Sequence, residues 1–107
     1  MQFDKDLNSI HKNLFLETRE FILTFEGVKE FKKERITTYF DDNGGLCHLR
    51  TMPDGIDIGF LKGAKMEDKF NLLRGKGKAI RVLSQIHLDQ ESVRYYVEQG
   101  IAINAKK

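Results

Sequence analysis

A short basic segment that contains two glycines is the first stretch of this sequence whose residue types could do chemistry. It reads Arg-Gly-Lys-Gly-Lys from residue 74 to residue 78. Glycine lets backbone N–H groups turn toward an anion and approach it closely, and the cationic side chains add positive charge. Ala79 and Ile80 break the two common phosphate-binding glycine patterns, GxxxxGK[ST] and GxGxxG. The segment therefore predicts either a weak site for a small anion or a solvated turn. The candidate anion-binding residues are Lys62, Arg74, Gly75, Lys76, Gly77, Lys78 and Arg81.

The positive charge of the chain is concentrated around this segment. Between Lys62 and Arg81, seven cations accompany two anions and give a net charge of +5, whereas the whole chain carries +2. A nucleic-acid site would combine such cations with exposed aromatic rings on which bases can stack. Phe70 is the only aromatic residue in this region, and its position predicts burial. A small anion is therefore the expected ligand of this region, and nucleic acid is not.

A second candidate is a set of titratable residues in the middle of the chain. Alternation along predicted strands places Arg50 beside Asp57, as a cross-strand ion pair, and His48 beside Tyr39 on one polar sheet face. His48 could act as an acid or a base. No nucleophile with an orienting partner accompanies it, because Cys47 is expected on the opposite face. We therefore predict a binding module and not an enzyme, with this polar face either open to solvent or covered by a protein partner, such as a second copy in a homodimer.

Helices at the two ends of the chain must support these groups. Apolar residues recur at helical spacing over residues 3–25, with a break near Lys12, and Gly27 is a natural stop. Asp89 is the expected N-cap of a final helix, which has its apolar stripe over residues 93–101. The helices thus flank the central segment that carries the candidate sites.

Three strands joined by two tight turns are predicted in the central segment. They comprise ERITTYFDD, GLCHLRTM and GIDIGFLKG, and the turns are centred on Asn43-Gly44 and Pro53-Asp54. A fourth strand is expected within KAIRVLSQI, residues 78–86. The fold class is therefore α+β: an antiparallel sheet, built from a three-strand meander plus a later strand, with N- and C-terminal helices packed on one face. The predicted register gives a mostly apolar face made of Ile36, Thr38, Phe40, Cys47, Leu49, Thr51, Ile56, Ile58 and Phe60.

The composition indicates a single domain over residues 1–107, with 40% hydrophobic and 32% charged residues. No apolar run reaches the roughly 20 residues that span a bilayer, and the N-terminal residues lack the apolar stretch of a secretory signal. Cys47 is the only cysteine, which excludes an internal disulfide. A cytoplasmic location without a membrane partner is the expectation.

Several of these segments resemble the YdhG-like family of small bacterial domains of unknown function. The resemblance is carried by FLKGAKMED, NLLRGKGKAIRVL, TREFILTFEGVKE and the final helix, and it covers nearly the whole chain. It implies a frataxin-like architecture, in which helices pack on one face of an antiparallel sheet. It also implies iron carriage by surface carboxylates, for which Glu17 and Glu20 are the candidate ligands. Lysines and arginines are interspersed with these acids, so an ordinary charged helix face is the alternative reading.

Three functions therefore remain open at the level of the sequence. The first is binding of an anion or phosphorylated metabolite at the basic glycine loop. The second is a frataxin-like iron chaperone that uses carboxylates of the first helical region, and it rests on the resemblance alone. The third is a protein–protein adaptor that uses the polar sheet face.

Overall fold

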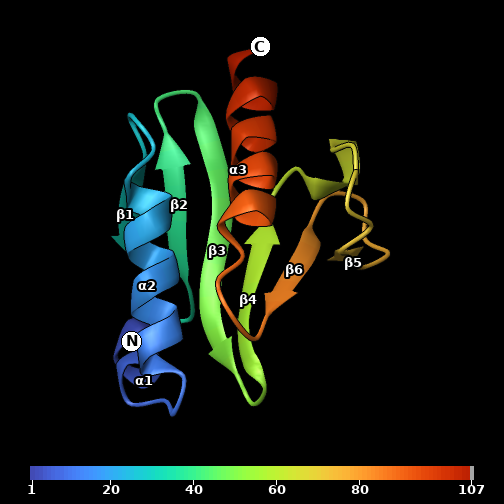
Figure 1. The fold of residues 1–107 in the computed structure, drawn as a ribbon. Helices are drawn as coiled ribbons and strands as arrows, with labels where there is room; N and C mark the ends of the chain where they lie inside the picture. The colour runs from blue at the N-terminus through green and yellow to red at the C-terminus, as the bar shows by residue number, and fades with distance from the viewer. Residues whose placement is uncertain (107) are drawn as a thin grey trace.

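The computed structural model describes residues 1–106 of the chain. A layer of helices lies against one antiparallel sheet (Figure 1). The helices are α1 (Gln2–Leu7), α2 (Lys12–Leu23) and α3 (Gln90–Ala105), with a short 3-10 helix, η1 (Gly63–Lys65). The strands are β1 (Lys29–Lys32), β2 (Thr37–Asp41), β3 (Gly44–Met52), β4 (Gly55–Phe60), β5 (Leu73–Arg74) and β6 (Arg81–Gln85). Among the described residues, no helix is both long enough and apolar enough to cross a membrane.

The sheet contains six strands within residues 1–106, in the order β1-β2-β3-β4-β6-β5, and each neighbouring pair is antiparallel. The predicted α+β fold is confirmed: the meander corresponds to β2, β3 and β4, and the later strand is β6. The two outermost strands were not predicted. β1 has the sequence KEFK, which is too charged to stand out, and β5 is only two residues long.

The helices cover one face of the sheet and build the core with it. In α2 the buried side chains are Phe15, Thr18 and Ile22, spaced by three and four residues so that they share one side of the helix. From α3, Val93, Tyr96 and Val97 reach the same core. The sheet contributes the fully or almost fully buried residues Tyr39, Cys47, Leu49, Ile56, Ile58, Phe60 and Leu83.

The register predicted for the second turn is confirmed. Pro53 and Asp54 form the loop between Met52 and Gly55, which are paired. Cys47 then faces Phe60, and the three inward side chains of β4 are all buried as expected. Arg50 and Asp57 are consequently opposite each other on the other face.

The register predicted for the first turn is wrong. The loop residues are Asp42 and Asn43, one position earlier than expected, because the Asp41 carboxylate accepts a hydrogen bond from the Asn43 N–H (2.8 Å) and fixes a local turn there. A β-bulge between Tyr39 and Phe40 then shifts the pairing again. The result inverts β2 relative to the prediction.

Tyr39 is the candidate residue most affected by this inversion. It pairs with Cys47, not His48, and its side chain is fully buried on the helix-covered face. Thr37 is also buried on that face, whereas Thr38 is the residue paired with His48. Tyr39 is therefore a core residue and not part of the polar sheet face.

A hydrogen-bonded ion pair accounts for the buried hydroxyl of Tyr39. Arg19 of α2 makes a two-pronged contact with Glu30 of β1, at 2.6 Å from Nε and 2.8 Å from Nη2. Tyr39 donates its hydroxyl to the same carboxylate at 2.9 Å. Burial alone would raise the pKa of Glu30, but the hydrogen bonds from Arg19 and Tyr39 outweigh it and lower the pKa. This trio, the Arg19–Glu30–Tyr39 network, joins α2 to the edge of the sheet.

We expect the Cys47 thiol to be unreactive in the folded protein. Its side chain is fully buried, and burial raises its pKa to about 12, so almost no thiolate forms near neutral pH. Reaction with a disulfide reagent should be slow in buffer and fast in denaturing urea. Fast labelling of the folded chain, with its circular dichroism spectrum unchanged, would contradict the position assigned to β3.

Candidate functional site

The face of the sheet opposite the helices, here called the open face, carries most of the candidate polar residues. The pairing of the strands places one residue from each strand in a row across this face, and His48 and Gly59 lie near its middle. A second row holds Arg50, Asp57 and Ser84. Because neighbouring positions in these rows share one face of the sheet, their side chains form one continuous surface. The first row consists of Phe31, Thr38, His48, Gly59, Val82 and Arg74.

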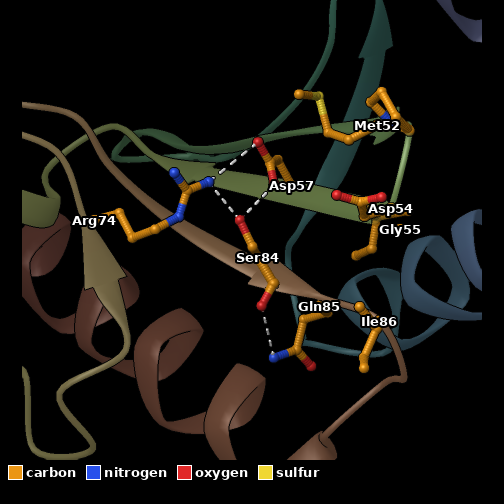
Figure 2. A pocket seen from close by; sticks show the side chains of 10 residues that line it. Met52, Asp54, Gly55, Asp57, Arg74, Ser84, Gln85 and Ile86 are labelled. Atoms are coloured by element: carbon orange, nitrogen blue, oxygen red, sulfur yellow. Dashed lines mark hydrogen bonds and ion pairs between the residues drawn. The ribbon is translucent and has the colours of Figure 1, made fainter.

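Asp57 is the centre of the polar contacts on the open face. Ser84 donates its hydroxyl to Asp57 Oδ1 at 2.6 Å, and Arg74 Nη2 donates to Ser84 Oγ at 2.5 Å (Figure 2). Arg74 Nη2 also lies 3.6 Å from Asp57 Oδ2. The predicted neighbour Arg50 is opposite Asp57 in register, but the ion pair of Asp57 is made with Arg74. The three side chains come from β4, β5 and β6.

Arg74 keeps binding capacity after making these contacts. Its side chain is 61% exposed. Its contacts with Ser84 and Asp57 use Nη2, and within the described residues its Nε and Nη1 groups form no hydrogen bond and remain available to a ligand. A hollow of about 400 Å³ adjoins this group, with Met52, Ser84 and Ile86 among its lining residues. Arginine presents such donors in a planar fork that suits a carboxylate or a phosphate.

A second hollow, of about 290 Å³, shares Asp57 and extends the same surface. Ile36, Ile80 and Val82 supply its apolar walls, and His48 and Arg50 its polar ones. Burial, together with the nearby charge of Lys33, lowers the pKa of His48, so its imidazole is neutral near pH 7. A neutral imidazole beside aliphatic side chains can accept or donate one hydrogen bond without carrying charge.

Exposed apolar side chains continue the open face beyond the two hollows. Phe31 is 57% exposed and Ile80 is 43% exposed. They lie toward opposite edges of the sheet, on or beside the same surface as His48. The open face therefore combines apolar groups with two exposed arginines.

The basic glycine loop leads into β6, as predicted, and it follows β5, which was not predicted. Gly75 has a φ of +124°, a conformation that favours glycine, whereas Gly77 has no positive φ. Arg81 Nη1 donates to the Gly77 and Ile80 carbonyl oxygens and so closes the loop on itself. A purely structural turn therefore explains why Gly75 and Arg81 occupy their positions in this loop.

The structure divides the other candidate cations between different surfaces. Lys62 donates to Asn104 near the end of α3, while Arg81 faces back onto the loop. Arg74 lies on the open face, and Lys76 and Lys78 are exposed. The seven candidate residues are thus not gathered around a single cradle.

The two candidate iron ligands, Glu17 and Glu20, are exposed on α2. Among residues 1–106, no group of three or more histidines, cysteines, aspartates and glutamates is placed to hold a metal ion.

The site residues that sequence reasoning missed are Ser84, Ile36 and Ile80. The last predicted strand corresponds to β6 and the one before it to β4. Pairing these two strands would have revealed Ser84, because it then lies opposite Asp57. Ile36 was assigned to the helix-covered face, because the predicted register of β2 was wrong, and Ile80 was placed in the fourth strand without a role in a site.

Comparison with known proteins adds no further assignment. No family model matches the chain, and no curated protein or solved structure is significantly similar to it. The function must therefore be argued from the surfaces described above.

Proposed function

We propose that this protein is a non-enzymatic binding module that docks a protein partner on the open face. The partner surface combines apolar side chains with carboxylates. The observation that carries the proposal is the composition of this face: the exposed apolar side chains Phe31 and Ile80 share it with two exposed arginines and one carboxylate. A sheet face of this kind, left without helices, is a typical protein-interaction surface.

Charge complementarity favours an acidic partner. Arg50 and Arg74 are exposed on the face, and Asp57 is already held by Ser84 and Arg74. The exposed Lys76 of the adjoining loop adds to the positive field. Carboxylates of a partner would meet the arginines, and its apolar side chains would cover Ile80 and its neighbours. In this proposal the arginines of the sheet supply the anion preference that was expected from the sequence.

A binding role is favoured over catalysis by the chemistry of the polar group. The Ser84 hydroxyl donates its proton to Asp57, and Arg74 contacts both residues, so the three form a fixed ion pair with one bridging hydroxyl. A serine nucleophile would instead donate its proton to a base that is itself oriented by a third group. His48 lies one row away, opposite Gly59.

We expect an acidic, apolar peptide to bind the open face weakly. The probe is acetyl-Glu-Leu-Glu-Leu-Glu-amide, titrated at low salt and followed by amide NMR. Shifts should concentrate in β3, β4 and β6. An Arg50→Ala, Arg74→Ala double variant should bind about two- to thirtyfold more weakly, since exposed ion pairs each contribute roughly 0.2–1 kcal/mol.

The matched controls are a basic peptide and a remote variant. Acetyl-Lys-Leu-Lys-Leu-Lys-amide should cause no comparable shifts, and Lys12→Ala, which removes an exposed cation from α2 on the other side of the sheet, should leave binding unchanged. Equal binding of both peptides would contradict the acidic partner. So would concentration-dependent dimerisation through the same amides without peptide, because the partner would then be a second copy of the chain.

A further inference from the structure

A separate pocket lies at the end of the molecule where α2 and α3 finish, beside the loop between β2 and β3 (Figure 1). Its volume is about 600 Å³, within the range of roughly 300–1,000 Å³ that is typical of small-ligand sites. Phe25, Ile101 and Ala102 supply apolar walls. The Phe25 ring is held edge-on against Phe21, with 5.6 Å between the ring centroids, so this wall is fixed by packing.

The residues that line this pocket carry negative charge only, and the nearby cations stand just outside it: Lys29 beside Asp42, Lys62 beside Asn104 and Lys106 at the end of α3. The acidic lining residues are Glu26, Asp41, Asp42 and Glu98, and none of the described lining residues is a lysine, arginine or histidine. The terminal carbonyl groups of α3 add partial negative charge to the same end, where Lys106 follows as the C-cap residue. Asp42 Oδ1 lies 3.6 Å from Lys29 Nζ. Both side chains are largely exposed, so this ion pair is weak and leaves most of the negative field of the lining acids in place.

One of these carboxylates is held in place by the fold. Asp41 Oδ1 accepts hydrogen bonds from the Asn43 N–H at 2.8 Å and from Asn104 Nδ2 at 3.4 Å. Asn104 is almost fully buried and also donates to the Gly45 carbonyl oxygen. The β2–β3 loop, α3 and Asp41 are therefore fixed relative to one another, and the acidic wall of the pocket is preorganised.

The spacing of the acids indicates what kind of cation the pocket suits. Among residues 1–106, no three acidic or histidine side chains come close enough to share a metal ion. An ion of atomic size could therefore contact only part of the rim and would not use the apolar walls. We propose that this pocket binds an organic cation with an apolar body, of the arylalkylamine class, whose hydrocarbon part lies against Ile101 and whose ammonium group faces the carboxylates. This site is independent of the open face and of the function proposed for it.

The test is a titration with three probes of matched size, followed by amide NMR of the full chain. 4-Phenylbutylamine should shift amides at Gly27, in the β2–β3 loop and in the last turns of α3. Neutral 4-phenylbutanol and anionic 4-phenylbutyrate should shift them at least about fivefold less at the same concentration. Amine binding should weaken with added salt, because the screening length is about 8 Å at 0.15 M.

Variants then test whether the acidic residues of the pocket bind the ammonium group. A Glu26→Gln, Glu98→Gln double variant should bind the amine about two- to tenfold more weakly. Ala102→Lys, at an exposed helical position, should abolish binding by placing an ammonium group in the pocket. Glu20→Gln removes an exposed acid from α2 outside the pocket and should change nothing.

Three results would overturn the proposal. The first is no shift at these amides at 10 mM amine and low salt. The second is equal binding of the amine and the alcohol, which would leave a merely apolar groove. The third is a saturable shift of the same amide signals by Mg²⁺, together with displacement of the amine. None of these results bears on peptide binding at the open face.

Discussion

Replacing Glu30 by alanine is expected to lower the free energy of unfolding by about 2–4 kcal/mol, somewhat less than the roughly 3–5 kcal/mol typical of breaking a fully buried ion pair. The carboxylate is the shared acceptor of the Arg19–Glu30–Tyr39 network, and its side chain is only 11% exposed. Without it, Arg19, which is 26% exposed, and the buried Tyr39 hydroxyl both lose their partner. Urea denaturation followed by circular dichroism measures the effect.

Two variants separate this mechanism from a general loss of charge. Glu20→Ala removes an exposed acid on α2 next to Arg19 and should change stability by less than about 0.5 kcal/mol. Tyr39→Phe keeps the ion pair and removes one hydroxyl, so it should cost only about 1 kcal/mol. If Glu30→Ala were as mild as Glu20→Ala, the network would contribute nothing to stability.

The same network predicts how stability depends on acid. The pKa of Glu30 is lowered in the folded state, so its contribution is present above the unfolded pKa and is lost as pH falls through the folded pKa. The wild-type chain should therefore lose stability below about pH 4.3, the ordinary glutamate pKa. Glu30→Gln should be less stable at pH 7 and should lose less on acidification. Parallel pH dependence of the two chains would contradict the assignment.

Replacing Gly55 by alanine is expected to cost about 3 kcal/mol, at the upper end of typical overpacking penalties. A Cβ atom at this position would lie 2.2 Å from the Gln85 carbonyl oxygen and 3.2 Å from Ile86 Cα. These are backbone atoms, which cannot rotate away as a side chain can. The start of β4 would have to separate from the end of β6, and the melting temperature should fall by roughly 10–20 °C for a domain of this size.

Gly45 provides the matched control for this prediction. A Cβ atom there would also meet a neighbour closely, at 2.5 Å, but that neighbour is Cδ1 of the flexible Leu61 side chain. A change of the Leu61 rotamer relieves the contact, so Gly45→Ala should cost about 1 kcal/mol or less. Equal effects of the two variants in thermal unfolding would show that the β4–β6 contact is looser than described.

Side-chain periodicity was sufficient to predict much of this fold, and local turn chemistry decided where it failed. The β3–β4 pairing followed from Pro53-Asp54 and strict alternation, and it proved correct. The predicted β2–β3 pairing relied on the strong hairpin preference of Asn43-Gly44. The hydrogen bond from the Asn43 N–H to the Asp41 carboxylate instead centres the turn one residue earlier. A single side-chain hydrogen bond and a bulge therefore exchange the two faces of β2, which no reading of alternation can reveal.

The candidate site was predictable to the extent that it depends on the correct pairing. Arg50 and Asp57 were placed on one face because β3 and β4 were paired correctly. The contact of Asp57 with Arg74 and Ser84 was not predicted, because it depends on which strands occupy the next two positions in the sheet. The burial of Tyr39 beside Glu30 could not be predicted either, because Glu30 lies on β1. The sequence of β1, KEFK, is too charged to be recognised as a strand.

The outer strands of the sheet also determine how another polypeptide can approach. One edge is β1, where Lys29 and Lys32 stand beside the unpaired backbone groups, and the other is β5, which offers only two residues. Lysines and very short strands are features that hinder an incoming chain from extending a sheet by backbone hydrogen bonding. Growth of the sheet from molecule to molecule is thus disfavoured at both ends, including during folding at high concentration. A polypeptide that meets this sheet must therefore be recognised through side chains and not through backbone pairing.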